Sequence, residues 1–196
     1  MILQEISDSF SELGVHLNSD WLAVLEIVQD ELLSVDSVYT ALMLSDLRES
    51  CDLPTTHKLS LAKLANSTSQ FPEGSFLFQI TKAIDISIDD AQRPRSTNSS
   101  RRVLKLILQY GSLSIDAVEV EPITQLRDVP DAGMKIIVSG SPTYCNKFLL
   151  LKSHNVQVAG GEIPTLSAAQ KEEHLGRQKM RDPLVYRPPL GGISNR

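Results

Sequence analysis

The chain has 196 residues, of which 41% are hydrophobic and 22% charged, and its mean hydropathy is −0.09. This length is enough for one domain, or two small ones, with a real hydrophobic core. No run of about 18 apolar residues occurs, so no transmembrane helix is predicted. The N-terminus, MILQEISDSF, has no basic residue before its apolar ones, which argues against a secretory signal. Cys51 and Cys145 follow no pairing pattern and indicate reduced thiols in an intracellular compartment.

The charged residues are unevenly distributed along the chain. Residues 1–70 contain 3 Lys or Arg and 11 Asp or Glu, a net charge of −8, whereas residues 71–163 contain 10 of each kind. Residues 164–196 contain 6 and 3, a net charge of +3. An acidic first third is a poor electrostatic match for a phosphate backbone, so the charge pattern favours a protein partner over free DNA.

The first 70 residues predict a small helical bundle. Apolar residues recur at helical spacing from Ile2 to Leu13, and Gly14 follows as a C-terminal stop. A second helix is predicted over residues 21–33, after the capping residues 18–20, and a third over residues 37–50. A short fourth helical piece is expected at 59–65. The polar segment 65–74 contains Pro and Gly and predicts a connector.

From Ser75 the hydrophobic period changes to that of a strand. Five strands are predicted, over residues 75–87, 101–111, 113–123, 134–140 and 148–163, the last of them interrupted by a polar turn. A turn of helix is expected between the third and the fourth. This arrangement is typical of an OB-type barrel, whose closure removes exposed sheet edges. Gly160 and Gly161 are expected to let the chain turn sharply off the barrel, where a side chain would obstruct closure.

The predicted fold class is therefore α+β. A three-helix bundle over residues 1–70 precedes a five-stranded OB-fold β-barrel over residues 71–163, and the tail 164–196 is part helix and part irregular. A long polar loop, residues 88–101, is inserted between the first two strands of the barrel. A loop of this length within a hairpin is either functional or disordered.

No pattern in the sequence indicates catalysis. The four histidines are scattered without metal-ligand spacing, and no phosphate-binding or nucleophile motif occurs, so the sequence predicts neither an enzyme nor a bound metal or cofactor. Single-strand nucleic-acid binding is the rival hypothesis, because OB barrels often bind single strands through aromatic and basic side chains. Tyr144 and Lys147 are the candidates for that role, and we expect any such affinity to be weak.

Several sequence blocks occur in an order known from one family. They are MLSDLRES (43–50), FPEGSFLFQITKAIDIS (71–87), RRVLKLILQYG (101–111), VEVEPI (118–123), PDAGMKIIVSG (130–140) and FLLLKSHNVQVAGGEI (148–163). Over residues 20–166 the chain resembles the N-terminal region of the RecQ-mediated genome instability protein 1 family, and the related N-terminal region of Tudor domain-containing protein 3. A chain that stops at residue 196 favours the first, whereas a piece of a longer protein fits the Tudor relative equally.

The resemblance implies a non-catalytic scaffold subunit of topoisomerase III, in some complexes joined by a RecQ-type helicase, that acts in DNA repair, recombination and genome stability. It implies a nuclear location, with a cytoplasmic one open for the Tudor relative. The partner-binding residues that it implies are Lys135, in Gly133-Met134-Lys135, and Arg93, Pro94, Arg95 and Arg101 of the inserted loop. Lys135 is expected to be an exposed charge at a strand end, so that Lys135→Glu changes stability by at most about 0.5 kcal/mol.

Overall fold

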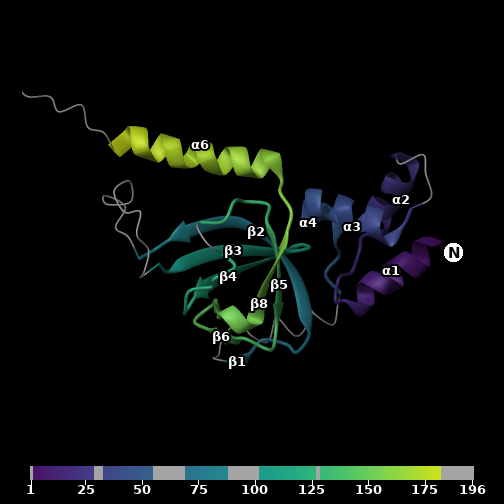
Figure 1. The fold of residues 1–196 in the computed structure, drawn as a ribbon, viewed down its shortest axis with the longest axis horizontal. Coiled ribbons are helices and arrows are strands. Elements are labelled where there is room, and N and C mark those ends of the chain that lie inside the picture. Colours follow the sequence, from purple (N-terminus) through teal and green to yellow (C-terminus); the bar gives the residue numbers. More distant parts are fainter. Residues whose placement is uncertain (1, 29–32, 55–68, 88–101, 127–128, 182–196) are drawn as a thin grey trace, which may run out of the picture.

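The computed structural model describes residues 2–28, 33–54, 69–87, 102–126 and 129–181. The chain begins with a group of helices, which lies beside a curled β-sheet, and a long helix follows the sheet (Figure 1). None of the helices in these described ranges is both long and apolar enough to cross a membrane. The predicted helical piece at 59–65 lies outside the described residues.

The N-terminal helices are α1 (Ile2–Glu12), α2 (Ser19–Val28), α3 (Val35–Leu44) and α4 (Leu47–Ser50). The Asn18 side chain accepts a hydrogen bond from the backbone N–H of Trp21 at 2.9 Å, so the predicted cap of the second helix is confirmed. The single third helix predicted over residues 37–50 is wrong. Ser45 has an extended backbone, and the Asp46 carboxylate caps α4 by accepting from the N–H of Arg48, which breaks the segment into two helices.

The strands form one sheet in the order β1-β6-β7-β4-β3-β2-β5-β8. Their bounds are β1 (Ser69–Gln70), β2 (Ser75–Asp85), β3 (Leu104–Tyr110), β4 (Leu113–Glu119), β5 (Lys135–Ser139), β6 (Thr143–Cys145), β7 (Phe148–Leu151) and β8 (Val156–Gly160). The β4–β7 pair is parallel and every other pair is antiparallel.

The predicted fifth strand is present as two strands, β7 and β8. The described strands form a curled sheet whose ends, β1 and β8, do not pair with each other, so the predicted closed five-stranded barrel is corrected to a curled sheet, which we call the barrel below. β7 pairs with β4 and β8 pairs with β5, and only residues 152–155, which include the 3-10 turn Ser153–Asn155, separate the two strands in the chain. The chain itself therefore joins two distant positions of the sheet and curls it. The short strands β1 and β6 were not predicted. The turn of helix expected between the third and fourth strands is a single turn in the described residues, closed by Leu126 N–H donating to the Ile123 carbonyl at 2.9 Å.

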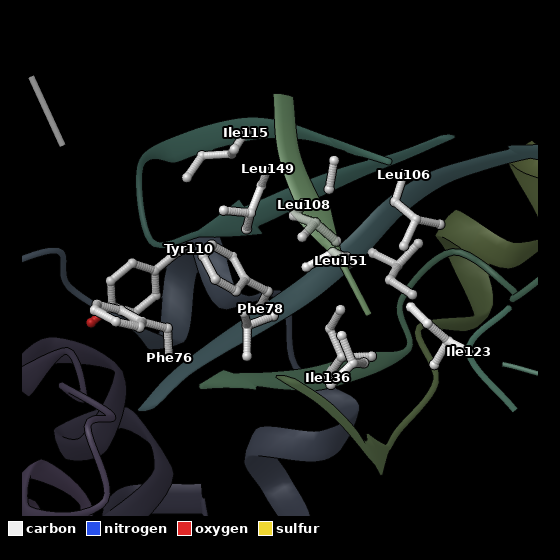
Figure 2. Close-up of a cluster of buried hydrophobic side chains, with 14 of the residues drawn as sticks. Phe76, Phe78, Leu106, Leu108, Tyr110, Ile115, Ile123, Ile136, Leu149 and Leu151 are labelled. Carbon is white, nitrogen blue, oxygen red and sulfur yellow. The ribbon is translucent and has the colours of Figure 1, made fainter. Parts of the chain in front are cut away.

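The barrel is filled by the side chains that alternate inward along its strands. Leu104, Leu106 and Leu108 of β3 are fully buried, while the residues between them, Lys105 and Ile107, are only partly buried. At one end of this core, the ring of Tyr110 packs edge-on against Phe76 and Phe78, with centroids 6.0 and 5.7 Å away (Figure 2). The period-2 pattern predicted from the sequence thus determines which side chains face the core.

A second hydrophobic cluster joins the helices to the outside of the barrel. Phe10, Leu42 and Leu47 of the helices bury their side chains against Leu77, which points outward from β2. Ile137 of β5 and Ala159 of β8 are partly buried against the same cluster. The helices therefore cover much of one half of the outer face of the barrel.

The two glycines that end β8 have different structural roles. Both have positive φ, 96° at Gly160 and 83° at Gly161. A Cβ at Gly160 would contact nothing within 4 Å, whereas a Cβ at Gly161 would lie 2.5 Å from the carbonyl oxygen of Met43 and 2.9 Å from Cδ of Lys135. A side chain at Gly161 would thus obstruct the approach of helix α3, which corrects the expectation that it would obstruct barrel closure.

This difference predicts unequal effects of two matched substitutions. Gly160→Ala is expected to cost about 1 kcal/mol of unfolding free energy, because alanine is strained at positive φ. Gly161→Ala is expected to cost about 2–3 kcal/mol, because the overlap with Met43 adds to the same strain. Urea denaturation of both variants measures the two values. Equal losses would show that the helices do not approach the backbone of Gly161 closely.

The predicted helix in the tail is present as α6 (Pro164–Arg181). Ile163 and Ser167 are buried at its start, and the Gln170 side chain accepts a hydrogen bond from the N–H of Ala132 at 2.6 Å. These contacts hold the first turns of α6, and the rest of the helix extends along and past the barrel (Figure 1). Residues 182–196 lie outside the described residues.

Candidate partner-binding surface of the barrel

The outer face of the barrel that the helices leave uncovered spans β2, β3, β4 and β7. We call it the open face, and its outward residues include Lys82, Ile84, Lys105, Ile107, Asp116, Val118, Phe148 and Leu150. Each of these side chains is only partly buried, so part of each is accessible to solvent. They adjoin one another because the strand register pairs Ile84 with Lys105, Lys105 with Val118, and Val118 with Leu150.

Two of the three charged side chains of the open face form an ion pair. The ammonium of Lys105 lies 2.9 Å from a carboxylate oxygen of Asp116, and also 5.2 Å from the ring centroid of Phe148. The third, Lys82, lies opposite Ile107 on the neighbouring strand, and the other outward residues in this set are aliphatic. The open face thus has one positive charge in excess and a single aromatic ring, far fewer than the basic and aromatic side chains that bind single-stranded nucleic acid, and its chemistry fits a protein surface better.

The inserted loop begins and ends beside the open face, and its two ends are held by buried polar contacts. The guanidinium of Arg102 donates to the Glu119 carboxylate at 2.7 Å, and both side chains are buried. Glu119 also accepts from the backbone N–H groups of Leu104 and Ile123. A buried carboxylate that accepts several hydrogen bonds is held rigidly, so the end of the loop that enters β3 has a fixed position.

The other end of the loop is tied to the same place. The Asp85 carboxylate, at the end of β2, accepts from the N–H of Ser87 at 3.0 Å and from the N–H of Val103 at 3.3 Å. Ile86 lies between these residues with its side chain 51% exposed, and Val120, after β4, is 48% exposed. Two exposed apolar residues thus extend the open face to the base of the loop.

Lys135 lies in a different part of the molecule, in the contact between helices and barrel. Its side chain is 0% exposed, and its ammonium donates to the carbonyl oxygen of Met43 at 2.7 Å. That carbonyl belongs to the last turn of α3, where backbone carbonyls lack partners within the helix and attract a cation. The expectation that Lys135 is exposed is therefore wrong, and the reason is a partner 92 residues away in the chain.

Burial changes the ionisation of this lysine. It lowers the pKa of Lys135 to about 8, although the nearby negative charge of Asp46 acts in the opposite direction. The neighbouring Gln79 accepts from the N–H of Leu47 at 2.9 Å and donates to Asp46 at 3.3 Å, so it joins α4 to β2. Burial also raises the pKa of the Cys51 thiol to about 12, which makes this cysteine unreactive at neutral pH. These residues orient the bundle on the barrel.

The other predicted site residues are not gathered into one place. Tyr144 lies on β6 and packs partly buried against the barrel core, while Lys147 is exposed in the turn after β6, with φ 69°. Their role in nucleic-acid binding stays a prediction. Arg93, Pro94, Arg95 and Arg101 lie outside the described residues. Lys135 as a partner-binding residue also stays a prediction, although a direct contact would require the helices to move.

The open face is not evident from the sequence, because alternation alone does not say which outward half is covered by helices. The structure also buries Arg102, which directly follows the inserted loop, with Glu119. The signal for this pair in the sequence is the alternation of β4, which places Glu119 on the same side as the buried Ile115 and Ala117, where a carboxylate requires a partner.

Comparisons with known proteins agree with this fold. A family model described as "RMI1, N-terminal OB-fold domain" matches residues 88–174. Over 99 residues the chain is 31% identical to RecQ-mediated genome instability protein 1 of Arabidopsis thaliana, which covers 50% of this chain and 15% of that protein. The Xenopus laevis protein of the same name is 28% identical over 122 residues, which make up 60% of this chain and 22% of that protein. The Mus musculus protein is 34% identical over 96 residues, which make up 48% of this chain and 16% of that protein. The chain therefore spans less than a quarter of the length of these relatives.

Proposed function

Since this chain belongs to the RecQ-mediated genome instability protein 1 family, we propose that it is a non-catalytic subunit that binds topoisomerase III and modulates its strand passage. In this role it supports genome stability in the RecQ pathway, with a RecQ-type helicase as a further partner and the nucleus as the place of action. The observation that carries the proposal is the open face, a largely aliphatic surface with few charged side chains beside the base of the inserted loop.

The shape of the surface supports protein binding. Protein interfaces have a core depleted in charge and a polar rim, and the open face has aliphatic residues on four adjacent strands around one Lys–Asp ion pair, with Lys82 as a further charge on β2. The strands beneath it pack on the hydrophobic core, which holds them in place before a partner arrives. A rigid surface loses little conformational entropy on binding.

The fixed base of the loop supports modulation. Arg102, Glu119 and Asp85 hold both ends of residues 88–101 at the edge of the open face. The family resemblance assigns partner binding to Arg93, Pro94, Arg95 and Arg101, which belong to this loop. We propose that these loop residues contact the topoisomerase and alter the opening of its gate, which changes the rate of decatenation without any catalytic group on this chain.

Charge introduced on the open face is expected to abolish this binding. In Val118→Asp/Leu150→Asp, two neighbouring aliphatic residues become carboxylates, and burying them in an interface without partners is costly. Titration calorimetry with purified topoisomerase III should show a loss of affinity of about 30-fold or more, which corresponds to about 2 kcal/mol. Gln157→Asp, at an exposed position of β8 away from this face, is the control and is expected to bind normally.

Two outcomes would contradict the proposal. One is wild-type chain that fails to bind topoisomerase III at micromolar concentration. The other is an unchanged affinity in the double variant, which would place the binding surface elsewhere. Fluorescent single-stranded DNA, measured beside the enzyme, tests the rival function. Affinity for the DNA that exceeds the affinity for the enzyme and falls steeply with salt would mean that the barrel binds nucleic acid.

A further inference from the structure

A second concave surface lies where the helices meet the barrel, on the half of the barrel away from the open face. It is a groove of about 640 Å³ between the end of α1, helix α3 and the start of β2. This volume lies within the range of about 300–1,000 Å³ that is typical of ligand-binding clefts. The groove is not part of the surface assigned to topoisomerase III.

The floor of the groove is apolar and comes from both parts of the fold. Phe10 and Leu42 contribute from the helices, and Leu77 and Ile137 from the barrel. At its edge, Leu13 is 67% exposed and Tyr39 is 46% exposed, although both are large apolar side chains. Such residues gathered around one depression mark a binding site more often than scattered exposed ones do.

The rim of the groove is acidic. Glu12 lies at the end of α1 and Glu73 lies before β2, and the described residues that line the groove include His16 but no Lys or Arg. The last turn of α1 has no basic residue, so the carbonyl oxygens of the helix C-terminus add partial negative charge there. The residues that line the groove therefore present negative charge around an apolar centre.

The helical region around the groove also has a negative net charge. Its described residues, 2–28 and 33–54, include nine Asp or Glu and a single Lys or Arg, which is Arg48. Arg48 is itself paired with Asp46. The field around the groove is thus negative well beyond its rim, which attracts a cationic segment and raises its rate of association.

The groove is formed before any ligand binds. Gly14 lines it in a left-handed conformation, with φ 79°, and its backbone lies against the carbonyl of Ser75, so that even a Cβ would overlap this oxygen. The buried bond from Lys135 to Met43 fixes the adjoining end of α3 on the barrel. A backbone contact and a buried hydrogen bond thus fix the helical wall of the groove against the barrel.

We propose that this groove binds a short segment of a protein partner in which a large apolar side chain is flanked by Lys or Arg residues. The apolar side chain fills the space between Leu13, Tyr39 and the floor, and its basic neighbours pair with Glu12 and Glu73. The charge of the groove excludes acidic peptides and nucleic acid. Because the groove and the open face lie on different halves of the barrel, the chain can hold this segment and another partner at the same time.

The test uses short synthetic peptides and the full chain. Fluorescein-labelled peptides with one Trp, Phe or Leu are made in two matched sets, one flanked by Lys and Arg and the other by Asp and Glu. Fluorescence anisotropy should show micromolar binding of basic peptides, weakened by added salt, and no binding of the acidic set. Failure of every basic peptide to bind would overturn the proposal, and so would equal binding of both sets.

Charge-reversal variants locate the site. Glu12→Lys/Glu73→Lys should weaken the best basic peptide by about tenfold or more. Glu5→Lys/Glu26→Lys makes the same change of net charge at exposed positions outside the groove, and should weaken it by less than about threefold, because salt screens charges beyond about 8 Å. Equal losses of peptide affinity in both variants would show that binding depends only on the net charge of the chain, and would contradict a binding site in the groove.

A neutral pair of variants tests the apolar part. Leu13→Ala should weaken binding several-fold, whereas Leu44→Ala, which is 61% exposed on α3 but outside the groove, should not. Sedimentation of the chain without peptide tests whether a second copy of this chain fills the groove instead. A dimer that dissociates in Glu12→Lys/Glu73→Lys would mean that a second copy fills the groove, contrary to the proposal. Binding to topoisomerase III should be normal in the same variants. If the groove binds no peptide, the proposed function of the open face is therefore unaffected.

Discussion

Replacing Lys135 by glutamate is expected to lower the free energy of unfolding by about 3–5 kcal/mol, since a carboxylate would be buried without a partner. The Met43 carbonyl would lose its donor, and the new negative charge would face the lone pairs of that oxygen. Asp46, linked to the same contact through Gln79, adds repulsion. Urea denaturation of Lys135→Glu beside the wild-type chain measures the loss.

Two other substitutions serve as controls for this result. Lys147→Glu, at an exposed turn, should change stability by no more than about 0.5 kcal/mol. Lys135→Met keeps the shape of the side chain without its charge, and should cost about 1–2 kcal/mol through the unpaired carbonyl. If Lys135→Glu is as stable as the wild-type chain, the ammonium of Lys135 is in water and the contact with α3 is absent.

The dependence of stability on pH provides an independent check of the same burial. The pKa of Lys135 is about 8 in the folded chain, against 10.5 without the protein environment. Between these values the unfolded chain binds a proton that the folded chain has released, so the stability of the wild-type chain relative to Lys135→Met should rise with pH from about 8 to about 10.5. The penalty of burying the charge is fully present below pH 8. A flat difference would indicate an exposed lysine.

Glu119→Gln is expected to destabilise the chain by about 3 kcal/mol or more, because it leaves the Arg102 guanidinium buried without a counter-charge. The amide of glutamine also replaces one acceptor oxygen by a donor, which faces the N–H of Leu104 or that of Ile123. Urea denaturation measures the effect. Asp116→Asn is the matched control, because its pair with Lys105 is partly exposed and should contribute less than about 1 kcal/mol.

The double variant Arg102→Met/Glu119→Gln distinguishes a buried ion pair from two independent side chains. Once the guanidinium is gone, the loss of the carboxylate charge should cost less, so the double variant should be more stable than the sum of the single effects predicts. Additive effects would show that Arg102 and Glu119 do not interact in solution.

Most of the barrel was predictable from its sequence because local patterns determine strands. The alternation of Leu104, Leu106 and Leu108 with Lys105 and Ile107 predicted β3 and its inward face, and burial confirms it. Besides the unpredicted short strands β1 and β6, two differences between the predicted and observed elements have local causes. Asp46 caps a new helix inside a segment that looked continuous, and the polar turn at residues 152–155 is long enough to carry β8 to the other side of the sheet.

The surroundings of Lys135 were not predictable from the sequence, for a physical reason. A lysine is expected at the surface unless a buried acceptor is available, and the acceptor of Lys135 is a carbonyl at the end of a helix far away in the chain. The same holds for the groove, whose acidic rim joins Glu12 to Glu73. No spacing in the sequence relates those residues, because their neighbourhood exists only after the helices have packed on the barrel.

The amino-acid sequence by itself determined the class of this fold, the order of helices and strands, the acidic character of the helical region, and the absence of known catalytic motifs, because each of these depends on neighbouring residues or on composition. Only the tertiary structure decided which half of the barrel stays uncovered, that Lys135 and Arg102 are buried, and that a groove separates α1 from β2. These features arise from contacts between residues far apart in the chain, whose free energy depends on the burial and partners that folding creates.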